Sequence, residues 1–219
     1  MKKVAVLLAA ASFGLTGLLS GCSNNENFTA RTYAAEGEVV SVSVDVSDRA
    51  VEIAPSADGT LRIEYYESEK QSYNISLSEA GALSVSLDLD LSWTDYIGAQ
   101  APAEYRTICI YLPQTLTDFT VSTTNEAISA TGTIAADSVS MAVNGGDLSF
   151  DKISAGSSVA LSAKNGNIRG TLLGGWDDYS IVCTVKKGDT NLPEQKEGGG
   201  KSLSVDCNNG NVNVGFALA

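Results

Sequence analysis

The chain contains no histidine, so it lacks the side chain that most often serves as a general base or as a metal ligand. Basic residues are also scarce, with 14 Lys and Arg against 26 Asp and Glu and a net charge of −12. An acidic surface repels phosphate backbones, which argues against a nucleic-acid partner. Only 4 prolines interrupt the chain, whereas 21 glycines and abundant Ser, Thr, Val and Asn are typical of strands and turns.

Cysteine is rare, and none of the 4 cysteines forms a C-x-x-C pair, which argues against a zinc or redox site. Three of them, Cys109, Cys183 and Cys207, lie in apolar runs that alternate like strands. We expect these three to be small buried apolar residues. A disulfide between Cys183 and Cys207 is the alternative, and an odd count leaves at least one thiol unpaired.

The longest apolar run lies at the start of the chain, from residue 4 to residue 19, directly after two lysines. A basic start, an apolar stretch and small residues before a cleavage point are the features of a secretory signal. The run is too short and too often interrupted by glycine and serine to favour a membrane-spanning helix. Its end resembles the lipobox of bacterial lipoproteins, with the residues Leu19, Ser20, Gly21 and Cys22.

This resemblance implies that residues 1–21 are removed and that lipid is attached to Cys22. Two or more acyl chains hold a protein stably at a membrane. We therefore expect an extracytoplasmic, membrane-anchored lipoprotein, with a signal peptide (1–21), a lipidated cysteine and polar tether (22–38) and one domain (39–219). It would face the cell surface or a periplasm, according to the type of envelope. An ordinary secretory signal, with Cys22 as a bystander, is the alternative.

A repeated pattern fills the second half of the chain. Each unit has apolar residues at its first, third and fifth positions, then Asn or Gly, and another apolar residue at the tenth position. The units begin at Phe119, Val139, Val159 and Leu203; the first three lie 20 residues apart, and a further step of 20 reaches Tyr179. An insertion is expected within residues 193–201. The alternation predicts half-buried strands. The turns between them are predicted at Asn144, Gly145, Asn165, Gly166, Asn209 and Gly210.

A fixed period of this length predicts a β-solenoid with coils of about 20 residues. Equivalent positions would then stack in columns, which places Cys183 and Cys207 next to each other in the core. The first half follows the pattern more loosely, so we expect longer strands and larger loops at that end. A series of β-hairpins in a sandwich is the alternative, because Asn-Gly between short strands also predicts hairpins.

The order of these units, preceded by Ile110-Tyr-Leu-Pro113, resembles the bacterial DUF4097 family, whose members are often labelled as adhesins. The resemblance covers residues 39–216 and includes the strings Asn125-Glu126, Asn165-Gly166 and Asn209-Gly210. Glu126 departs from the family pattern, in which glycine is usual at that place. The resemblance implies an all-β fold, a right-handed single-stranded β-helix at the cell envelope, and it brings no catalytic residues.

Carboxylates are the only candidates for catalysis. Asp88 and Asp90 alternate with leucines on one predicted strand, so both side chains are expected to point away from the core. With Asp95 they are candidates for a calcium ion or for action on a polysaccharide. A solvated strand face is the simpler interpretation, because calcium loops concentrate Asp, Asn and Gly at fixed spacing.

Aromatic residues are better candidates for a binding surface, namely Trp93, Tyr96 and Tyr105 in one long loop. Exposed aromatic rings near carboxylates suit a glycan or a peptide. The alternative is that these rings, like Trp176 and Tyr179 further on, cover an open end of the stack, since terminal coils need caps.

We therefore expect a lipid-anchored envelope protein that presents a long, acidic, repetitive face for binding, adhesin-like and without catalytic activity. Its partners would be the membrane, through the lipid on Cys22, and a glycan, an envelope polymer or an envelope protein. No metal and no cofactor other than the lipid is expected. A scaffolding or envelope-stress sensing module is the alternative, and a polysaccharide-active enzyme is a further one. The oligomeric state is left open.

Overall fold

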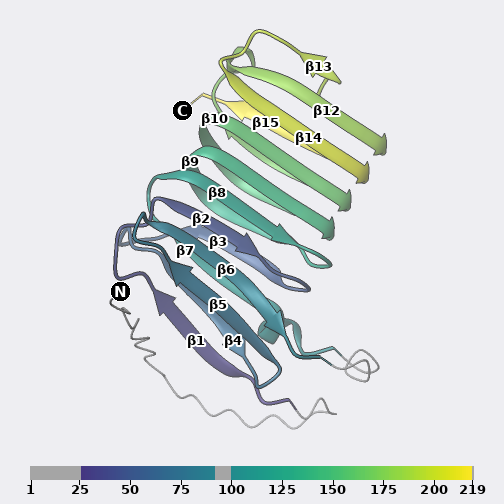
Figure 1. Ribbon diagram of the computed structural model, residues 1–219. Helices are drawn as coiled ribbons and strands as arrows, with labels where there is room; N and C mark the ends of the chain where they lie inside the picture. Colours follow the sequence, from purple (N-terminus) through teal and green to yellow (C-terminus); the bar gives the residue numbers. More distant parts are fainter. Residues whose placement is uncertain (1–25, 92–99, 219) are drawn as a thin grey trace, which may run out of the picture.

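The computed structural model describes residues 26–91 and 100–218, and these ranges contain 15 strands and no α-helix. All 15 strands belong to one mixed sheet that curls around a single apolar core (Figure 1). The prediction of an all-β fold is therefore confirmed. Two short 3₁₀ turns, η2 (Ala103–Arg106) and η3 (Trp176–Asp178), complete the described structure. Nothing helical in this part of the chain has the length and apolar character needed to span a membrane.

The strands differ in length between the two halves of the chain. Those of the first half are β1 (Thr29–Ala34), β2 (Ser41–Asp45), β3 (Ala50–Pro55), β4 (Arg62–Glu67), β5 (Gln71–Leu77), β6 (Ala82–Leu89) and β7 (Thr107–Leu112). Those of the second half are β8 (Leu116–Thr123), β9 (Ile128–Gly145), β10 (Leu148–Asn165), β11 (Ile168–Leu173), β12 (Tyr179–Lys187), β13 (Gln195–Lys196), β14 (Lys201–Asn209) and β15 (Val212–Ala217). The expectation of longer strands in the first half is wrong, because β9 and β10 have 18 residues each and β6 only 8. The short strands arise because the first half reverses direction in antiparallel pairs, such as β1–β4 and β5–β6.

The sheet contains two runs of strands that share β9 and β10. The first run has the order β5-β6-β2-β8-β9-β10-β14-β12-β13. The second run has the order β1-β4-β7-β3-β9-β10-β11-β15. Figure 1 shows the strands stacked from β1 at one end to β13 at the other. The long strands β9 and β10 pass from one run to the other, which closes the two runs over one core.

The predicted alternation places the core residues correctly. On β8 the side chains of Phe119, Val121 and Thr123 are buried, and on β10 those of Val159 and Leu161 are buried. The residues between them face outward, as a half-buried strand requires. Burial of these apolar columns, at roughly 25 cal/mol per Å² of apolar surface, is the main stabilising term of the fold.

The predicted register is confirmed for the first three units. Phe119 pairs with Val139 and Val139 with Val159, each 20 residues apart. The fourth step is wrong: β10 pairs with β14, not with β12, and Ala163 lies opposite Cys207. The reason is the connection between β14 and β15. Because β15 pairs with β11 and only a short turn joins it to β14, β14 must lie beside β10.

Because β14 lies between β10 and β12, Cys183 and Cys207 do not occupy the positions predicted for them. Cys183 and Cys207 are both buried, and they lie on the adjacent strands β12 and β14. However, Cys183 lies opposite Val205, and Cys207 lies opposite Val185. The two thiols are therefore offset by two residues instead of sharing one column, and both are free.

The turn glycines are confirmed at Gly166 and Gly210, which have positive φ, whereas in the second unit Gly146 takes this role instead of Gly145. Gly145 pairs with Asn165 in the predicted 20-residue register, so the place of Gly166 is taken by Gly146 in the second unit. A Cβ atom on Gly166 would overlap with the carbonyl oxygen of Gly146. Only glycine therefore allows these stacked turns to approach so closely.

The C-terminal end of the stack is covered by its own chain. The predicted insertion contains β13, which pairs antiparallel with the outer edge of β12. Asn191 donates its side-chain amide to the carbonyl of Val214 (2.9 Å) and accepts from the N–H of the same residue (3.0 Å), which satisfies the edge of β15. The rings of Trp176 and Tyr179 both contact Phe216. Such coverage protects edge strands from pairing with other chains.

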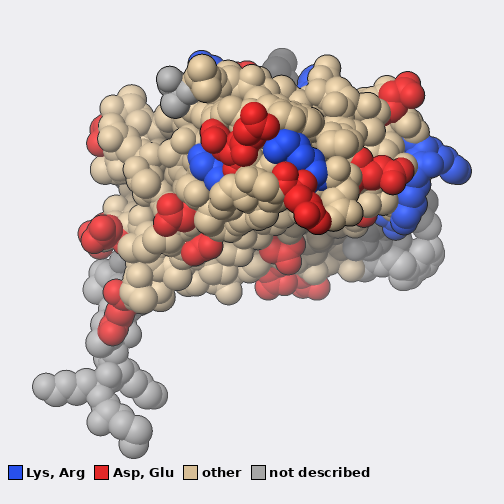
Figure 2. Space-filling view, turned by 90° about the horizontal axis from the view of Figure 1, so that it is seen from above, with Lys and Arg blue, Asp and Glu red and all other residues tan. Residues whose placement is uncertain are grey.

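Figure 2 looks onto this end and shows acidic and basic groups gathered side by side at its centre. Lys196 donates to the carbonyl oxygen of Tyr179 (2.9 Å) and lies 3.7 Å from the carboxylate of Asp177. Opposite charges therefore neutralise one another at the C-terminal end, although the chain as a whole is acidic.

Candidate binding surface

The outer face of the first run is rich in hydroxyl groups. Between the buried residues of each strand, outward positions stand in register across seven strands, from β6 to β12. Of these 21 positions, 14 are Ser or Thr, three are Asp and none is Lys or Arg. One row contains Ser84, Ser43, Thr120, Ser140, Ala160, Ser204 and Val182; the next contains Ala82, Ser41, Asp118, Ser138, Ser158, Ser202 and Ser180; the third contains Ser86, Asp45, Ser122, Ala142, Ser162, Asp206 and Thr184. We call this surface the hydroxyl face.

The hydroxyl face is repetitive, as predicted, but hydroxyl groups outnumber carboxylates on it. Neighbouring strands lie about 4.8 Å apart, so the rows present donors and acceptors at a regular spacing. Some are already paired, since the hydroxyls of Ser138 and Ser158 lie 2.8 Å apart and Ser122 donates to Asp45 at 2.6 Å. Val182 adds an exposed apolar side chain near the C-terminal end of the face.

The structure places the predicted site residues on the first half of the stack. Asp88 is exposed on β6, two positions beyond Ser86 on the same outer face, and Asp90 follows the strand. Trp93, Tyr96 and Asp95 lie outside the described residues. The same holds for the lipobox Leu19, Ser20, Gly21 and Cys22.

Tyr105 is part of a ring cluster at the N-terminal end of the stack. Its ring stacks on Phe28 with a centroid separation of 4.9 Å and meets Tyr66 edge-on at 5.1 Å. One face of this predicted binding residue is therefore occupied by the chain itself. The neighbouring Glu104 carboxylate raises the pKa of the Tyr105 hydroxyl.

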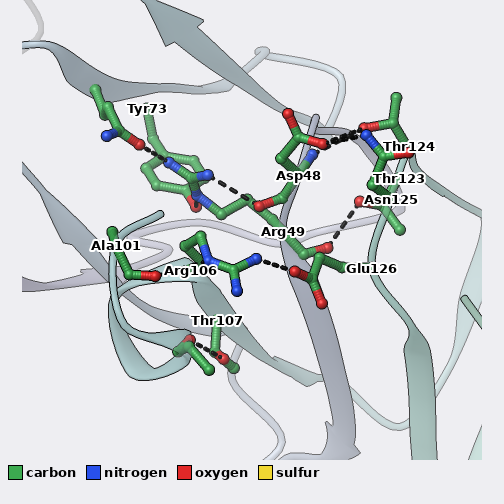
Figure 3. Close-up of polar contacts among 12 residues, drawn as sticks. Asp48, Arg49, Tyr73, Ala101, Arg106, Thr107, Thr123, Thr124, Asn125 and Glu126 are labelled. Carbon is green, nitrogen blue, oxygen red and sulfur yellow. Dashed lines mark hydrogen bonds and ion pairs between the residues drawn. The ribbon is translucent and has the colours of Figure 1, made fainter. Parts of the chain in front are cut away.

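Sequence reasoning missed a buried arginine beside this cluster. Arg49 follows β2 and is only 2% exposed. Its guanidinium donates to the hydroxyl of Tyr73 (3.1 Å), to the carbonyl of Asp48 (3.0 Å) and to the side-chain oxygen of Gln71 (Figure 3). All these described partners are neutral, and burial raises the pKa of Tyr73. A buried guanidinium that has no carboxylate among its hydrogen-bond partners requires neutral acceptors for its N–H groups.

A carboxylate lies beyond Gln71, on the side away from the positive charge of Arg49. The side-chain nitrogen of Gln71 donates to both oxygens of Glu26, at 3.1 and 2.9 Å. Gln71 therefore connects the guanidinium of Arg49 to a carboxylate. Glu26 lies in the segment predicted to be a polar tether, and β1 lies there too, where it pairs with β4. The ordered structure thus begins earlier in the chain than residue 39.

A shallow groove of about 250 Å³ lies on the outer face of the second run, lined by residues that include Glu52, Cys109, Tyr111 and Ser129. Cys109 corrects the expectation of a buried thiol, because Ile108 and Ile110 take the inward positions of β7 and Cys109 points outward. Burial against its neighbours and the carboxylate of Glu52, 3.7 Å from the sulfur, raise the pKa of Cys109 to about 11. The described residues contain no group of three or more ligands suited to a metal ion.

The predicted turn asparagines hold the stack together. Asn209 donates its side-chain amide to the side-chain oxygen of Asn165 (2.7 Å), which in turn donates to the carbonyl of Asn144 (3.3 Å). A second ladder joins Asp147, Asn167 and Asn211 through backbone and side-chain groups. Because these polar groups bind one another from turn to turn, they stabilise the stacking of the strands.

Comparison with known proteins settles the family. A model of the Toastrack DUF4097 family matches residues 39–217. The chain belongs to this family. No curated protein matches it. Among solved structures, a "putative cell adhesion protein" from Clostridium sporogenes is 12% identical with a TM-score of 0.58, and the match covers 87% of this chain and 100% of that chain. A "putative adhesin" from Bacteroides fragilis is 12% identical with a TM-score of 0.36, over 90% of this chain and 100% of that chain. The first of these similarities shows a shared fold.

The β8–β9 turn has Glu126 at the place that Gly146 and Gly166 take in the next two units. Glu126, which stands where glycine is usual, forms an ion pair with Arg106 (Figure 3). Arg106 also donates to the carbonyl oxygen of Ala101 at 2.9 Å. The glutamate therefore ties the β8–β9 turn to η2, at the point where the chain returns from residues 92–99.

Proposed function

We propose that this Toastrack protein is a lipid-anchored, extracytoplasmic binding protein of the adhesin type, without catalytic activity. The lipobox sequence ending at Cys22 supports the anchor. The shared fold with a protein described as a "putative cell adhesion protein" supports a role in contact with other surfaces. A scaffolding or stress-sensing role remains an alternative for the same architecture.

In this proposal the sheet is a short right-handed β-solenoid. The 20-residue register from β8 to β10, and from β9 through β10 to β11, supports stacked coils. Stacked coils repeat their outer side chains at the strand spacing, which makes an extended and regular binding surface. The insertion of β14 between β10 and β12 continues this surface without a gap.

The observation that carries the proposal is the hydroxyl face. It offers hydroxyl donors and acceptors in three parallel rows, with a few carboxylates and no cation. Such groups suit the hydroxyls of an extended polysaccharide, of the envelope or of a neighbouring cell, and disfavour a polyanion. Asp88 continues the face on β6, where its exposed position supports contact with a ligand.

The proposal can be tested with the purified full chain on an array of glycans, peptidoglycan fragments and matrix proteins, with and without calcium. We expect saturable binding that is lost in the variant Ser43→Arg/Ser140→Arg, because two long cationic side chains would cover neighbouring hydroxyls of the rows. The matched control is Ser129→Arg/Ser149→Arg, which makes the same change on the outer face of the second run. If the protein binds nothing on the array, or if only the control variant loses binding, the hydroxyl face is not the binding surface.

A further inference from the structure

The three residues before β1 are fastened to the domain by two side chains. The carboxylate of Glu26 accepts hydrogen bonds from the side-chain nitrogen of Gln71 (3.1 and 2.9 Å) and from the hydroxyl of Ser68. The ring of Phe28 lies on Tyr105, nearly parallel at 10°. Asn27, between them, is exposed. We call residues 26–28 the strap.

The strap has an energetic reason to stay in place. Through Gln71, Glu26 provides the negative charge that balances Arg49, which is almost fully buried. Removing Glu26 would leave the side-chain nitrogen of Gln71 without its acceptor and would remove the carboxylate that Gln71 connects to the buried guanidinium, which is costly in a low-dielectric environment. The strap leads directly into β1, which is paired with β4 from Thr29 to Ala34.

We infer that the strap fixes the β1–β4–β5 end of the domain beside the membrane, a conclusion that rests on the proposed lipid at Cys22. Only Ser23, Asn24 and Asn25 separate that cysteine from Glu26. Four Cα–Cα steps span at most about 14 Å, whereas a tether that was free as far as Thr29, where β1 begins to pair with β4, would span about 25 Å. The strap thus shortens the reach of the anchor to a little more than half.

The opposite end of the stack then points away from the bilayer. In the first run, eight strand spacings separate β5 from β13, which is about 38 Å along the sheet. The acidic domain is repelled by anionic headgroups, which favours an upright stack over one that lies flat. The surface facing the membrane is therefore the end that carries the ring cluster, and the hydroxyl face stands along the side, open to partners.

The test uses the acylated full chain in vesicles of phosphatidylcholine and phosphatidylglycerol that carry an acceptor dye on the headgroups. A fluorescent amino acid replaces Glu69, in the β4–β5 turn, in one sample and Glu197, near β13, in another; both side chains are exposed. The dye pair has its half-transfer distance between the two expected heights. We expect energy transfer from position 69 to exceed that from position 197 by about twofold or more, because roughly 38 Å of sheet separates the two ends.

The variant Glu26→Ala/Phe28→Ala should lower this ratio toward one, because it releases the strap and lengthens the tether. Asn27→Ala is the matched control and should leave the ratio unchanged. A ratio near one in the unaltered protein, or an unchanged ratio in the double variant, would overturn the strap. If the unaltered protein fails to float with vesicles, the anchor itself is wrong. Thermal unfolding then tests the strap without the membrane. We expect a lower unfolding midpoint for Glu26→Ala than for Asn27→Ala, and equal midpoints would refute the strap.

Discussion

The guanidinium of Arg106 pairs with the carboxylate of Glu126, a residue 20 positions further along the chain. Both side chains are mostly shielded from water, at 17% and 30% exposure. The pair connects η2 to the β8–β9 turn, so it joins the irregular first half of the stack to the first regular unit. Glu126 has a negative φ, so this turn does not require the glycine of the related turns, and its side chain is free to bind Arg106.

Glu126→Gln should lower the free energy of unfolding by about 1–2 kcal/mol, because it removes a partly buried charge-assisted hydrogen bond. Urea unfolding, followed by the fluorescence of the two tryptophans, measures the change. Glu79→Gln is the matched control, since Glu79 is exposed in the β5–β6 turn, and its substitution should have an effect close to zero. Equal effects of the two changes would show that the ion pair contributes nothing to stability.

Gln71→Leu should lower the free energy of unfolding by about 2–3 kcal/mol, because it removes one of the three acceptors of the buried Arg49 guanidinium and detaches Glu26. The double variant Arg49→Met/Gln71→Leu should be more stable than Gln71→Leu alone, since two apolar side chains leave no uncompensated charge. A double-mutant cycle from urea unfolding measures this coupling. Strictly additive losses would mean that Gln71 does not serve Arg49.

Gly166→Ala should destabilise the protein by at least about 2 kcal/mol, because its Cβ would overlap with the carbonyl of Gly146 and its positive φ disfavours any side chain. Gly200→Ala is the control, because no atom lies within 4 Å of its added Cβ. The control should stay within about 0.5 kcal/mol of the unaltered protein. Unfolding midpoints in urea compare the two, and similar midpoints would show that the turns tolerate a side chain.

The apolar alternation was enough to predict the strands of the second half, because positions such as Val159 and Leu161 must face one core. The 20-residue spacing likewise predicted the stacking of Ile128, Leu148 and Ile168. It could not predict that β14 enters between β10 and β12, because β12 and β14 carry the same alternation and only the pairing of β15 decides between them.

The candidate site was harder to predict. The serines of the hydroxyl face were visible between the apolar positions of each unit, and their register follows from the period. The burial of Arg49 had no local signal, since it depends on Tyr73 and Gln71 from another hairpin. The contacts of Glu26 and Phe28 were missed for the same reason, because a polar segment next to a predicted anchor has the composition of a linker.

Cys109 should make stability fall as the pH rises from about 9 to about 11. Burial, then the carboxylate of Glu52, raise the pKa of this thiol from the ordinary value of 9.0 to about 11 in the folded protein. Between these values the unfolded chain has lost the proton and the folded protein has kept it, so the unfolded state gains stability. Urea midpoints at several pH values measure the slope, and Cys109→Ala should have a shallower slope than the unaltered protein. Identical slopes would mean that the thiol titrates normally in the fold.

The same raised pKa should protect Cys109 from alkylation, although its side chain is only half-buried. At about pH 8 a thiol with a pKa near 11 holds roughly 100-fold less thiolate than one with a pKa near 9, and the thiolate is the reactive form. Iodoacetamide should therefore modify Cys109 of the folded protein slowly, as followed by peptide mass spectrometry. Glu52→Gln should speed the reaction, because it removes a negative charge beside the sulfur, whereas Glu79→Gln should not. If neither change alters the rate, access to the groove and not the charge of Glu52 controls the reactivity of the thiol.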